Sequence, residues 1–197
     1  MSKPAVFLDK DGTLVRDVPY NVDPARIILT EGVEDGVRKL HAAGFSLVVV
    51  SNQSGVARGY FEEADLEAVW TRLRDLSGVP FHVYYCPHHP EGYAPYNVAC
   101  GCRKPEPGML LEAAKEHDLD LSQSWMIGDI LNDVEAGRRS GCRTVLLDNG
   151  GETEWQLSRE RLPHHIVDTF AEAAEIVLSL SARQLVGTSR TSSVHTD

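Results

Sequence analysis

The sequence FLDKDGTLV, residues 7–15, combines an apolar run with two carboxylates and a glycine. It starts within the apolar run AVFL, residues 5–8, and places two carboxylates, Asp9 and Asp11, just ahead of Gly12. A buried strand that ends in acidic side chains and a turn-forming glycine carries those side chains to one edge of a sheet. An ordinary Asp-Gly turn at a strand end has the same residues, so the function of this stretch depends on what accompanies it.

Five further apolar runs follow along the chain, each with the length of a strand. They cover residues 45–50, 81–85, 125–127, 144–147 and 165–167. Between them, apolar residues at helical spacing predict helix faces formed by Val33, Val37 and Leu40, by Leu66, Val69 and Leu73, and by Leu110, Leu111 and Ala114. Strands that alternate with helices predict an α/β fold with a doubly wound, Rossmann-like parallel sheet whose strands are buried on both faces. Ligands of such folds bind outside the carboxyl ends of the strands.

The composition is that of an ordinary globular protein, with 42% apolar and 24% charged residues in a chain of 197. This length predicts a single domain, placed at residues 1–180. Residues 181–197, SARQLVGTSRTSSVHTD, are rich in serine and threonine and predict a disordered tail. The first residues hold only a four-residue apolar run, so neither a signal peptide nor a membrane span is expected, and we interpret the chain as cytoplasmic.

The net charge of −10 argues against nucleic acid or a membrane surface as the partner. An enzyme that processes nucleic-acid ends would need a basic groove, which this charge balance opposes. A small phosphorylated ligand is compatible with an acidic chain, because a few lysines, arginines and main-chain amides can hold one phosphate group.

Three more polar segments lie beside the predicted strands and helices. SNQSG (51–55) follows the second strand, CRKPEPGM (102–109) precedes a helix, and IGDILND (127–133) places Asp129 just after the fourth strand. Ser51 offers a hydroxyl, and the residues after it can turn main-chain N–H groups toward a phosphate. Lys104 adds a cation, and Asp129 can complete a Mg²⁺ site with Asp9. Each of these groups taken alone is typical of a turn or a loop.

Together with FLDKDGTLV, these groups resemble the four motifs of the haloacid dehalogenase superfamily of aspartyl phosphohydrolases. The resemblance runs from about residue 5 to residue 150, and every motif residue is present. It implies that Asp9 attacks phosphorus to form an aspartyl-phosphate, and that Asp11 protonates the leaving group and then deprotonates water. It also implies that Ser51 and Lys104 bind the phosphoryl oxygens.

The same resemblance implies a Mg²⁺ site made of the Asp9 carboxylate, the main-chain carbonyl of Asp11, and Asp129. The cation and Lys104 would offset the repulsion between a carboxylate and a phosphate group. Two roles stay open for Asp133, which can touch a metal-bound water or cap a helix.

The stretch CPHHPEGYAPYNVACGC, residues 86–102, holds three of the four cysteines. Its four potential metal ligands are Cys86, His88, Cys100 and Cys102. Such a Cys₃His set favours a closed structural zinc site, which would stiffen the loop and fix Arg103 and Lys104 beside the crevice. A disulfide and a catalytic Cys–His pair are the alternatives, although nothing indicates export and the aspartyl chemistry makes a second nucleophile redundant. Cys142 is predicted to be a buried apolar side chain.

Within the superfamily, the segments CPHHPEG, GCRKPEPGML and SNQSGVARG and the Asp17–Tyr20 pattern are most similar to the D-glycero-D-manno-heptose 1,7-bisphosphate 7-phosphatases. The related histidinol-phosphatase domains share the zinc loop. This resemblance implies a monomer without a large cap domain, and therefore an open site. It implies substrate contacts from Asp17, Tyr20, Ser51, Asn52, Gln53, Ser54, Arg103 and Lys104.

The activity implied by this resemblance is Mg²⁺-dependent removal of the 7-phosphate of the heptose bisphosphate, in the synthesis of nucleotide-activated heptose for surface polysaccharide. The basic residues Arg58, Arg103 and Lys104 favour such an anion over histidinol phosphate, which is the alternative substrate. A catalytically silent zinc protein is the alternative of another class, and the presence of every motif residue argues against it. The sequence does not distinguish the α from the β anomer.

Overall fold

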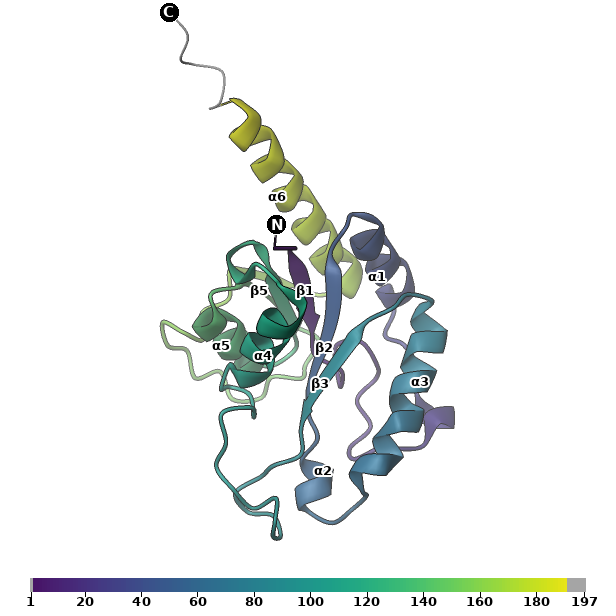
Figure 1. Cartoon of the computed structure of the whole chain (residues 1–197). Coiled ribbons are helices and arrows are strands. Elements are labelled where there is room, and N and C mark those ends of the chain that lie inside the picture. Colours follow the sequence, from purple (N-terminus) through teal and green to yellow (C-terminus); the bar gives the residue numbers. More distant parts are fainter. Residues whose placement is uncertain (1, 191–197) are drawn as a thin grey trace, which may run out of the picture.

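The computed structural model describes residues 2–190 and places six parallel strands in one sheet, in the order β3-β2-β1-β4-β5-β6 (Figure 1). The strands are β1 (Ala5–Leu8), β2 (Ser46–Asn52), β3 (His82–Cys86), β4 (Trp125–Gly128), β5 (Arg143–Leu147) and β6 (His165–Val167). All six predicted strands are present, with ends that differ from the prediction by at most two residues. The predicted α/β fold with a doubly wound parallel sheet is confirmed.

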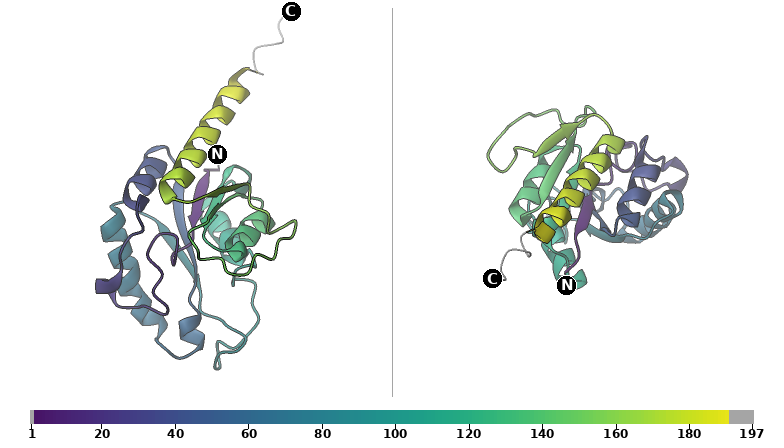
Figure 2. Two further views of the ribbon diagram at one scale, coloured as in Figure 1. Left: turned by 180° about the vertical axis from the view of Figure 1, so that it is seen from behind. Right: turned by 90° about the horizontal axis from the view of Figure 1, so that it is seen from above.

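Helices cover both faces of this sheet (Figures 1 and 2). They are α1 (Val33–Ala42), α2 (Ser54–Ala57), α3 (Leu66–Ser77), α4 (Gly108–His117), α5 (Leu131–Ser140) and α6 (Phe170–Arg190), with short 3-10 turns at Pro24–Arg26, Glu63–Asp65 and Leu121–Gln123. The helices α1, α3 and α6 pack on one face, and α4 and α5 pack on the other. Residues 9–45, between β1 and β2, contain only α1 and one 3-10 turn, so no large cap domain is inserted there, as predicted.

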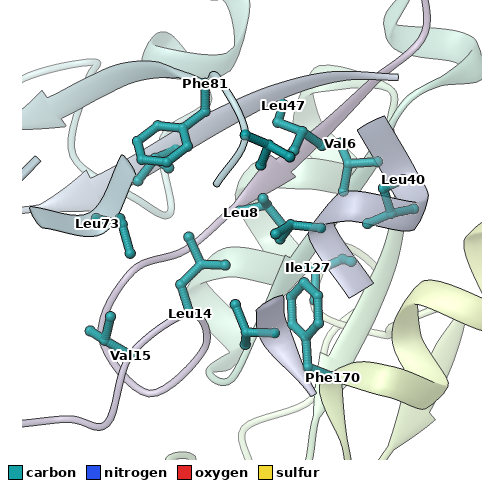
Figure 3. Packing of buried hydrophobic residues seen from close by; sticks show 14 of the residues in the cluster. Val6, Leu8, Leu14, Val15, Leu40, Leu47, Leu73, Phe81, Ile127 and Phe170 are labelled. Atoms are coloured by element: carbon teal, nitrogen blue, oxygen red, sulfur yellow. The ribbon is translucent and has the colours of Figure 1, made fainter. Parts of the chain in front are cut away.

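The side chains of each strand alternate between the two faces and so build two separate cores. Val6 and Leu8 of β1 point toward α1, α3 and α6, where Phe170 packs with them (Figure 3). Phe7 points to the opposite face and packs in the cluster that contains Leu110 of α4. Because β1 lies inside the sheet and is buried on both faces, the chain that leaves its carboxyl end is held firmly in place.

The prediction that every strand is buried on both faces is wrong at the edges of the sheet. In the edge strand β6, Ile166 is 54% exposed. In β3, at the opposite edge, the first residue His82 is exposed. An edge strand has a neighbour on one side only, and the helices that cover the central strands do not fully shield its outer side chains.

The predicted helix face of Leu110, Leu111 and Ala114 is wrong by one position. Leu110 is fully buried against the sheet, whereas Leu111 is 47% exposed. Met109 and Ala113 complete the buried face. The direction in which α4 leaves the preceding loop turns positions 109, 110 and 113 toward the sheet, and the spacing alone does not determine that rotation.

The predicted disordered tail begins too early, because α6 continues to Arg190. The segment SARQL, residues 181–185, contains alanine, arginine, glutamine and leucine, which are good helix formers and allow α6 to continue. The remaining tail residues, 191–197, lie outside the described residues. The extent of the domain at residues 1–180 stays a prediction.

The order of the strands brings two acidic segments together. The chain runs outward from β1 to β2 and β3, and then returns through α4 to β4 on the other side of β1. The carboxyl ends of β1 and β4 therefore lie side by side where the strand order reverses, which is where doubly wound sheets bind ligands. Asp9 follows β1 and Asp129 follows β4. Within residues 2–190, no helix combines the length and apolar character that a membrane span requires.

Two neighbouring leucines of α4 test this packing with the same change of side chain. Leu110→Ala should lower the free energy of unfolding by about 2–5 kcal/mol, because it leaves a cavity in the core. The matched control Leu111→Ala should cost less than about 1 kcal/mol, because that side chain is half exposed. Urea unfolding measures both values, and equal losses would contradict the position of α4.

Candidate active site

A cavity of about 560 Å³ opens at the carboxyl ends of β1, β2 and β4. Seven of the predicted site residues line it, namely Asp9, Asp11, Asp17, Ser51, Asn52, Lys104 and Asp129. Its size suits a small ligand, because ligand pockets commonly measure about 300–1,000 Å³. The cavity is therefore the candidate active site.

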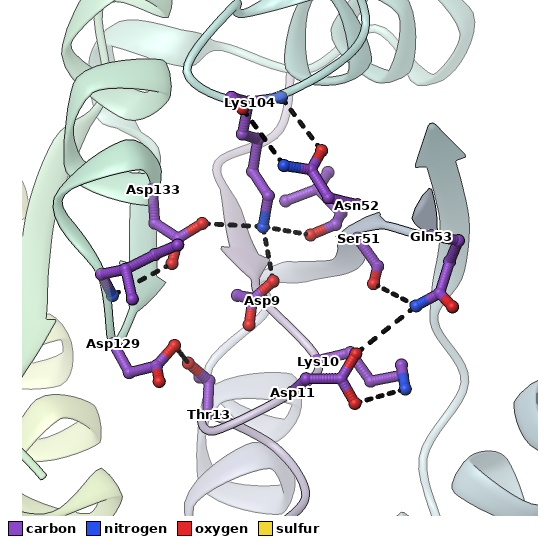
Figure 4. A network of polar contacts seen from close by, with 12 residues as sticks. Asp9, Lys10, Asp11, Thr13, Ser51, Asn52, Gln53, Lys104, Asp129 and Asp133 are labelled. Carbon is purple, nitrogen blue, oxygen red and sulfur yellow. Dashed lines mark hydrogen bonds and ion pairs between the residues drawn. The ribbon is translucent and has the colours of Figure 1, made fainter. Parts of the chain in front are cut away.

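Asp9 and Lys104 form the centre of this site (Figure 4). Lys104 is 2% exposed, and its ammonium group forms an ion pair with Asp9 and donates to the main-chain oxygen of Val50 at 2.9 Å. The same ammonium group lies 2.7 Å from Asp133 Oδ1. Burial alone would lower the pKa of Lys104, but Asp133 and Asp9 outweigh it and raise the pKa above its ordinary value. Lys104 is thus a permanent buried cation.

The main chain of Lys104 is fixed as firmly as its side chain. Its N–H donates to Asn52 Oδ1 at 3.0 Å, and Asn52 Nδ2 donates to its carbonyl oxygen at 3.1 Å. These two hydrogen bonds connect the loop before α4 to the end of β2 and fix the position of the loop. Ser51, one residue earlier, is 1% exposed and accepts a hydrogen bond from Gln53 Nε2 at 2.7 Å.

Asp129 approaches Asp9 from the end of β4. Thr13 Oγ1 donates to its Oδ1 atom at 3.4 Å. The backbone passes close by on two sides, since a Cβ atom on Gly12 or on Gly151 would collide with Asp129 Oδ2. Burial, and next the neighbouring Asp133, raise the pKa of Asp129 to about 7. The carboxyl group is therefore held in one place, and too little positive charge surrounds it to stabilise its ionised form.

Asp11 has a different environment from Asp9. Its Oδ1 atom lies 2.5 Å from Lys10 Nζ, and its Oδ2 atom accepts from Gln53 Nε2 at 3.4 Å. Lys10 is itself buried, with its ammonium group 5.9 Å from the ring centre of Trp70. The two contacts orient the Asp11 carboxylate (Figure 4). Its side chain is 34% exposed, against 11% for the side chain of Asp9, so Asp11 lies nearer to solvent.

The residues present fit a divalent cation. Carboxylate oxygens of Asp9, Asp129 and Asp133 all lie within 4.8 Å of one another. Burial raises the pKa of Asp9, Lys104 opposes this, and Asp133 and Asp129 raise it further. Lys104 is the one cation that contacts these carboxylates in the part of the chain that the structure describes. A hard cation such as Mg²⁺ would therefore supply the missing charge. The side chain of Asp11 is turned toward Lys10, so its predicted role as a ligand rests on its main-chain carbonyl.

The structure separates the predicted substrate-binding residues into two groups. Asp17, Ser51, Asn52 and Lys104 line the cavity, whereas Tyr20, Gln53, Ser54 and Arg103 do not. Gln53 supports the site indirectly through Ser51 and Asp11. Tyr20 is 48% exposed in a left-handed backbone conformation, and its ring packs edge-on against Tyr60 with ring centres 4.6 Å apart. Arg103 Nη1 donates to the carbonyl oxygen of His88 at 3.4 Å.

Sequence reasoning missed several residues of the cavity. Arg16, Thr30, Asn149, Gly150 and Gly151 line it. Asn149 Nδ2 donates to the carbonyl oxygen of Gly12 at 2.6 Å and so ties the loop after β5 to the loop after β1. The sequence signal was the polar stretch DNGG at the end of the fifth predicted strand. Ligands of such sheets bind outside the carboxyl ends of the strands, so this stretch is as well placed as those after the other strands.

The predicted zinc ligands converge at the end of β3. The three sulfur atoms of Cys86, Cys100 and Cys102 lie 2.9–3.4 Å from one another, and His88 Nδ1 lies 3.4 Å from Cys102 Sγ. No disulfide joins the cysteines, all four of which lie in the described chain. Tetrahedral zinc with Zn–S bonds of about 2.3 Å needs sulfur atoms about 3.8 Å apart, so the four groups fit that metal with a small expansion. Cys142 is buried elsewhere, as expected.

The raised pKa of Asp129 makes the effect of Mg²⁺ on stability depend on pH. In the metal-free folded chain the carboxyl keeps its proton up to about pH 7, whereas in the unfolded chain it loses it near 3.8. The free energy of unfolding of the metal-free chain therefore falls as the pH rises between these values. Because a cation binds the ionised form, Mg²⁺ should raise the melting temperature more at about pH 8 than at about pH 5.5.

Thermal melts with Mg²⁺, and with K⁺ at matched ionic strength as the control, measure this difference. A rise that is equal at both pH values, or that K⁺ reproduces, would contradict a Mg²⁺ site built on Asp129.

Comparison with known proteins places the chain in a family. Residues 101–173 match the family model described as HAD-hydrolase-like. A relative from Haemophilus ducreyi, named D-glycero-beta-D-manno-heptose-1,7-bisphosphate 7-phosphatase, is 42% identical over 77% of this chain and 86% of its own length. A relative of the same name from Pasteurella multocida is 36% identical over 91% of this chain and 100% of its own length.

A solved structure agrees with these relatives. The D,D-heptose 1,7-bisphosphate phosphatase from B. bronchiseptica, complexed with magnesium and phosphate, covers 90% of this chain and 98% of its own, with a TM-score of 0.73 and 29% identity. The predicted resemblance is confirmed. The chain belongs to the haloacid dehalogenase-like hydrolases, in the family of the D-glycero-beta-D-manno-heptose-1,7-bisphosphate 7-phosphatases.

Proposed function

We propose that this chain is a Mg²⁺-dependent phosphatase that removes the 7-phosphate of D-glycero-D-manno-heptose 1,7-bisphosphate. The single observation that carries the chemistry is the position of Asp9, a buried carboxylate at the base of an open cavity, in contact with the buried cation Lys104. The names of its relatives support the substrate, and they specify the β anomer. We therefore expect the β anomer to be preferred.

Asp9 acts as the nucleophile. One of its carboxylate oxygens forms a bond to the phosphorus atom while the bond from phosphorus to the sugar oxygen breaks, which gives an aspartyl-phosphate and the free sugar hydroxyl. Water then attacks the same phosphorus atom, and the bond to Asp9 breaks to release inorganic phosphate. Asp9 follows a strand whose four residues are all buried, so its carboxylate is positioned before the substrate arrives.

Asp11 acts as the general acid and then as the general base. It gives a proton to the leaving sugar oxygen, and later takes a proton from the attacking water. The contacts with Lys10 and Gln53 hold its carboxyl group at the entrance, where the leaving group and the water must pass. Asp9 is thus the buried nucleophile, and Asp11 is the more exposed residue that transfers protons.

Lys104 and Ser51 bind the phosphoryl oxygens as Asp9 approaches. Lys104 supplies a fixed positive charge that needs no reorganisation during the reaction. The Ser51 oxygen already accepts a hydrogen bond from Gln53, so its own hydroxyl proton is left to donate toward a phosphoryl oxygen. Because the Lys104 ammonium group is shared with Asp133, that carboxylate keeps the lysine aligned. Asp133 also accepts from the main-chain N–H of Ile130, at the start of α5.

Asp9, Asp129 and the main-chain carbonyl of Asp11 would hold Mg²⁺. A bound Mg²⁺ supplies charge neutralisation between the nucleophile and the phosphate group. Gly12 and Gly151 permit this arrangement because their missing side chains leave room for the Asp129 carboxylate. Asp133 lies within reach of the same site, but its ion pair with Lys104 gives it a supporting role.

Cys86, His88, Cys100 and Cys102 would hold a structural zinc ion. With four protein ligands the site is closed, so it leaves no position for a substrate or a nucleophilic water. Its last ligand stands two residues before Lys104, and the carbonyl oxygen of His88 accepts from Arg103. The metal would therefore fix the path of the chain into the active site.

Phosphate release in the presence of Mg²⁺ tests the proposed reaction. The wild-type chain should have a higher kcat/KM for the β anomer of the heptose bisphosphate than for the α anomer or for histidinol phosphate. Asp9→Asn should lower kcat by about 10³-fold or more, because the nucleophile is lost, and should keep its circular dichroism spectrum. The control Asp75→Asn changes an exposed aspartate outside the cavity and should keep full activity. A preference for histidinol phosphate would overturn the substrate, and an active Asp9→Asn variant would overturn the nucleophile.

The zinc proposal is tested with the cysteine that lies outside the cluster. Cys100→Ser should reduce the zinc content below one per chain and lower the melting temperature, because a structural metal contributes to folding. Cys142→Ser should keep its zinc, since Cys142 is buried away from the four ligands. Elemental analysis and thermal melts measure both. Equal zinc content in the two variants would contradict the assignment.

A further inference from the structure

The cavity is lined by two cations that have very different partners. Lys104, at the base, is already shared between Asp9, Asp133 and the main-chain oxygen of Val50. Arg16 lines the same cavity but is exposed to solvent. Among residues 2–190, no carboxylate lies within ion-pair distance of its guanidinium group. Arg16 is therefore the lining cation that is available to a ligand.

The two other arginines that were expected to contact a bisphosphate contact residues that do not line this cavity. Arg58 Nη2 lies 3.2 Å from His89 Nε2 and 3.4 Å from Glu91 Oε2. Arg103 Nη1 donates to the carbonyl oxygen of His88. Both arginines support the loop that follows β3, and neither lines the cavity.

The main chain holds Arg16 in a fixed position relative to the reacting groups. Its N–H donates to the carbonyl oxygen of Ile28 at 3.0 Å. The preceding residue, Val15, forms one β-bridge with Asp11 and another with Leu29. Arg16 is thus fixed to the segment that carries Asp11. The free-energy cost of ordering this part of the chain is therefore small when a ligand binds both residues.

The charges around Arg16 explain what ligand it would take. Asp11, Asp17 and Asp129 line the cavity together with Asp9, so a second phosphate group would meet mainly carboxylates unless a cation faced it. A guanidinium group forms paired hydrogen bonds with a phosphate, which gives it both charge and direction. Lys104 cannot serve this purpose, because the phosphate that reacts with Asp9 occupies its side of the cavity.

We propose that Arg16 binds the phosphate group of the sugar bisphosphate that is not hydrolysed, and that it selects bisphosphates over monophosphates. This assignment rests on the proposed function. It adds a binding site for the remote phosphate at the entrance, formed by a residue outside the four motifs.

Steady-state kinetics with two substrates test this assignment. The substrates are the heptose 1,7-bisphosphate and the heptose 7-phosphate, which carries the same reacting group without the remote phosphate. Arg16→Ala should lower the ratio of kcat/KM for the bisphosphate to that for the monophosphate by about 10-fold to 100-fold, mainly through KM. Arg16→Lys should restore part of this ratio, because it keeps the charge and loses the paired geometry. The control Arg72→Ala removes an exposed arginine outside the cavity and should leave the ratio unchanged.

The outcomes separate the two proposals. If the wild-type chain hydrolyses the bisphosphate and Arg16→Ala lowers both kcat/KM values equally, or neither, the role of Arg16 is overturned while the proposed function stands. If the wild-type chain hydrolyses neither sugar phosphate, the proposed function fails, and the role of Arg16 fails with it. A selective loss in Arg16→Ala with partial recovery in Arg16→Lys supports both.

Discussion

The buried ammonium group of Lys104 connects the segments that form the active site. It joins Asp9 at the end of β1, Asp133 in α5 and the main chain of Val50 in β2, while Asn52 binds the main chain of Lys104 itself. Removing one partner from such a buried ion-pair network costs about 3–5 kcal/mol, because the remaining charge has no water to solvate it. The contact that holds these segments together also places a cation beside the nucleophile.

The surrounding structure holds carboxylates in fixed positions around this one charge. The parallel sheet brings the ends of β1 and β4 together, and the close backbone at Gly12 and Gly151 confines Asp129 beside Asp9. Burial, and next the neighbouring carboxylate of Asp133, raise the pKa of Asp129, so a divalent cation would supply the positive charge that its ionised form needs. The cluster of cysteines and histidine lies just before Lys104 in the chain, so a metal there would stabilise the same lysine from the other side.

The sequence predicted the parts of the structure that depend on local patterns. Short apolar runs located all six strands. Polar residues at strand ends placed Asp9, Ser51 and Asp129 in one cavity, and the segment before a predicted helix added Lys104. It did not predict which way side chains turn. The rotation of α4 exposes Leu111, and Arg103 turns to the carbonyl of His88, because neighbouring elements decide both directions. Arg16 was missed for the same reason, since its place in the cavity depends on the pairing of Val15 with Leu29, a residue outside the four motifs.

The most direct test of the proposed mechanism is to capture the covalent intermediate on Asp9. The enzyme is mixed with the β anomer of the heptose bisphosphate and Mg²⁺, quenched with acid during turnover, and reduced with borohydride, which converts an aspartyl-phosphate into homoserine. Mass spectrometry of the peptide that contains residues 5–15 then locates the change. The proposed mechanism predicts homoserine at position 9 in the wild-type chain and none in Asp9→Asn. Reduction at Asp11 or Asp129, or steady phosphate release with no reduced residue, would contradict it.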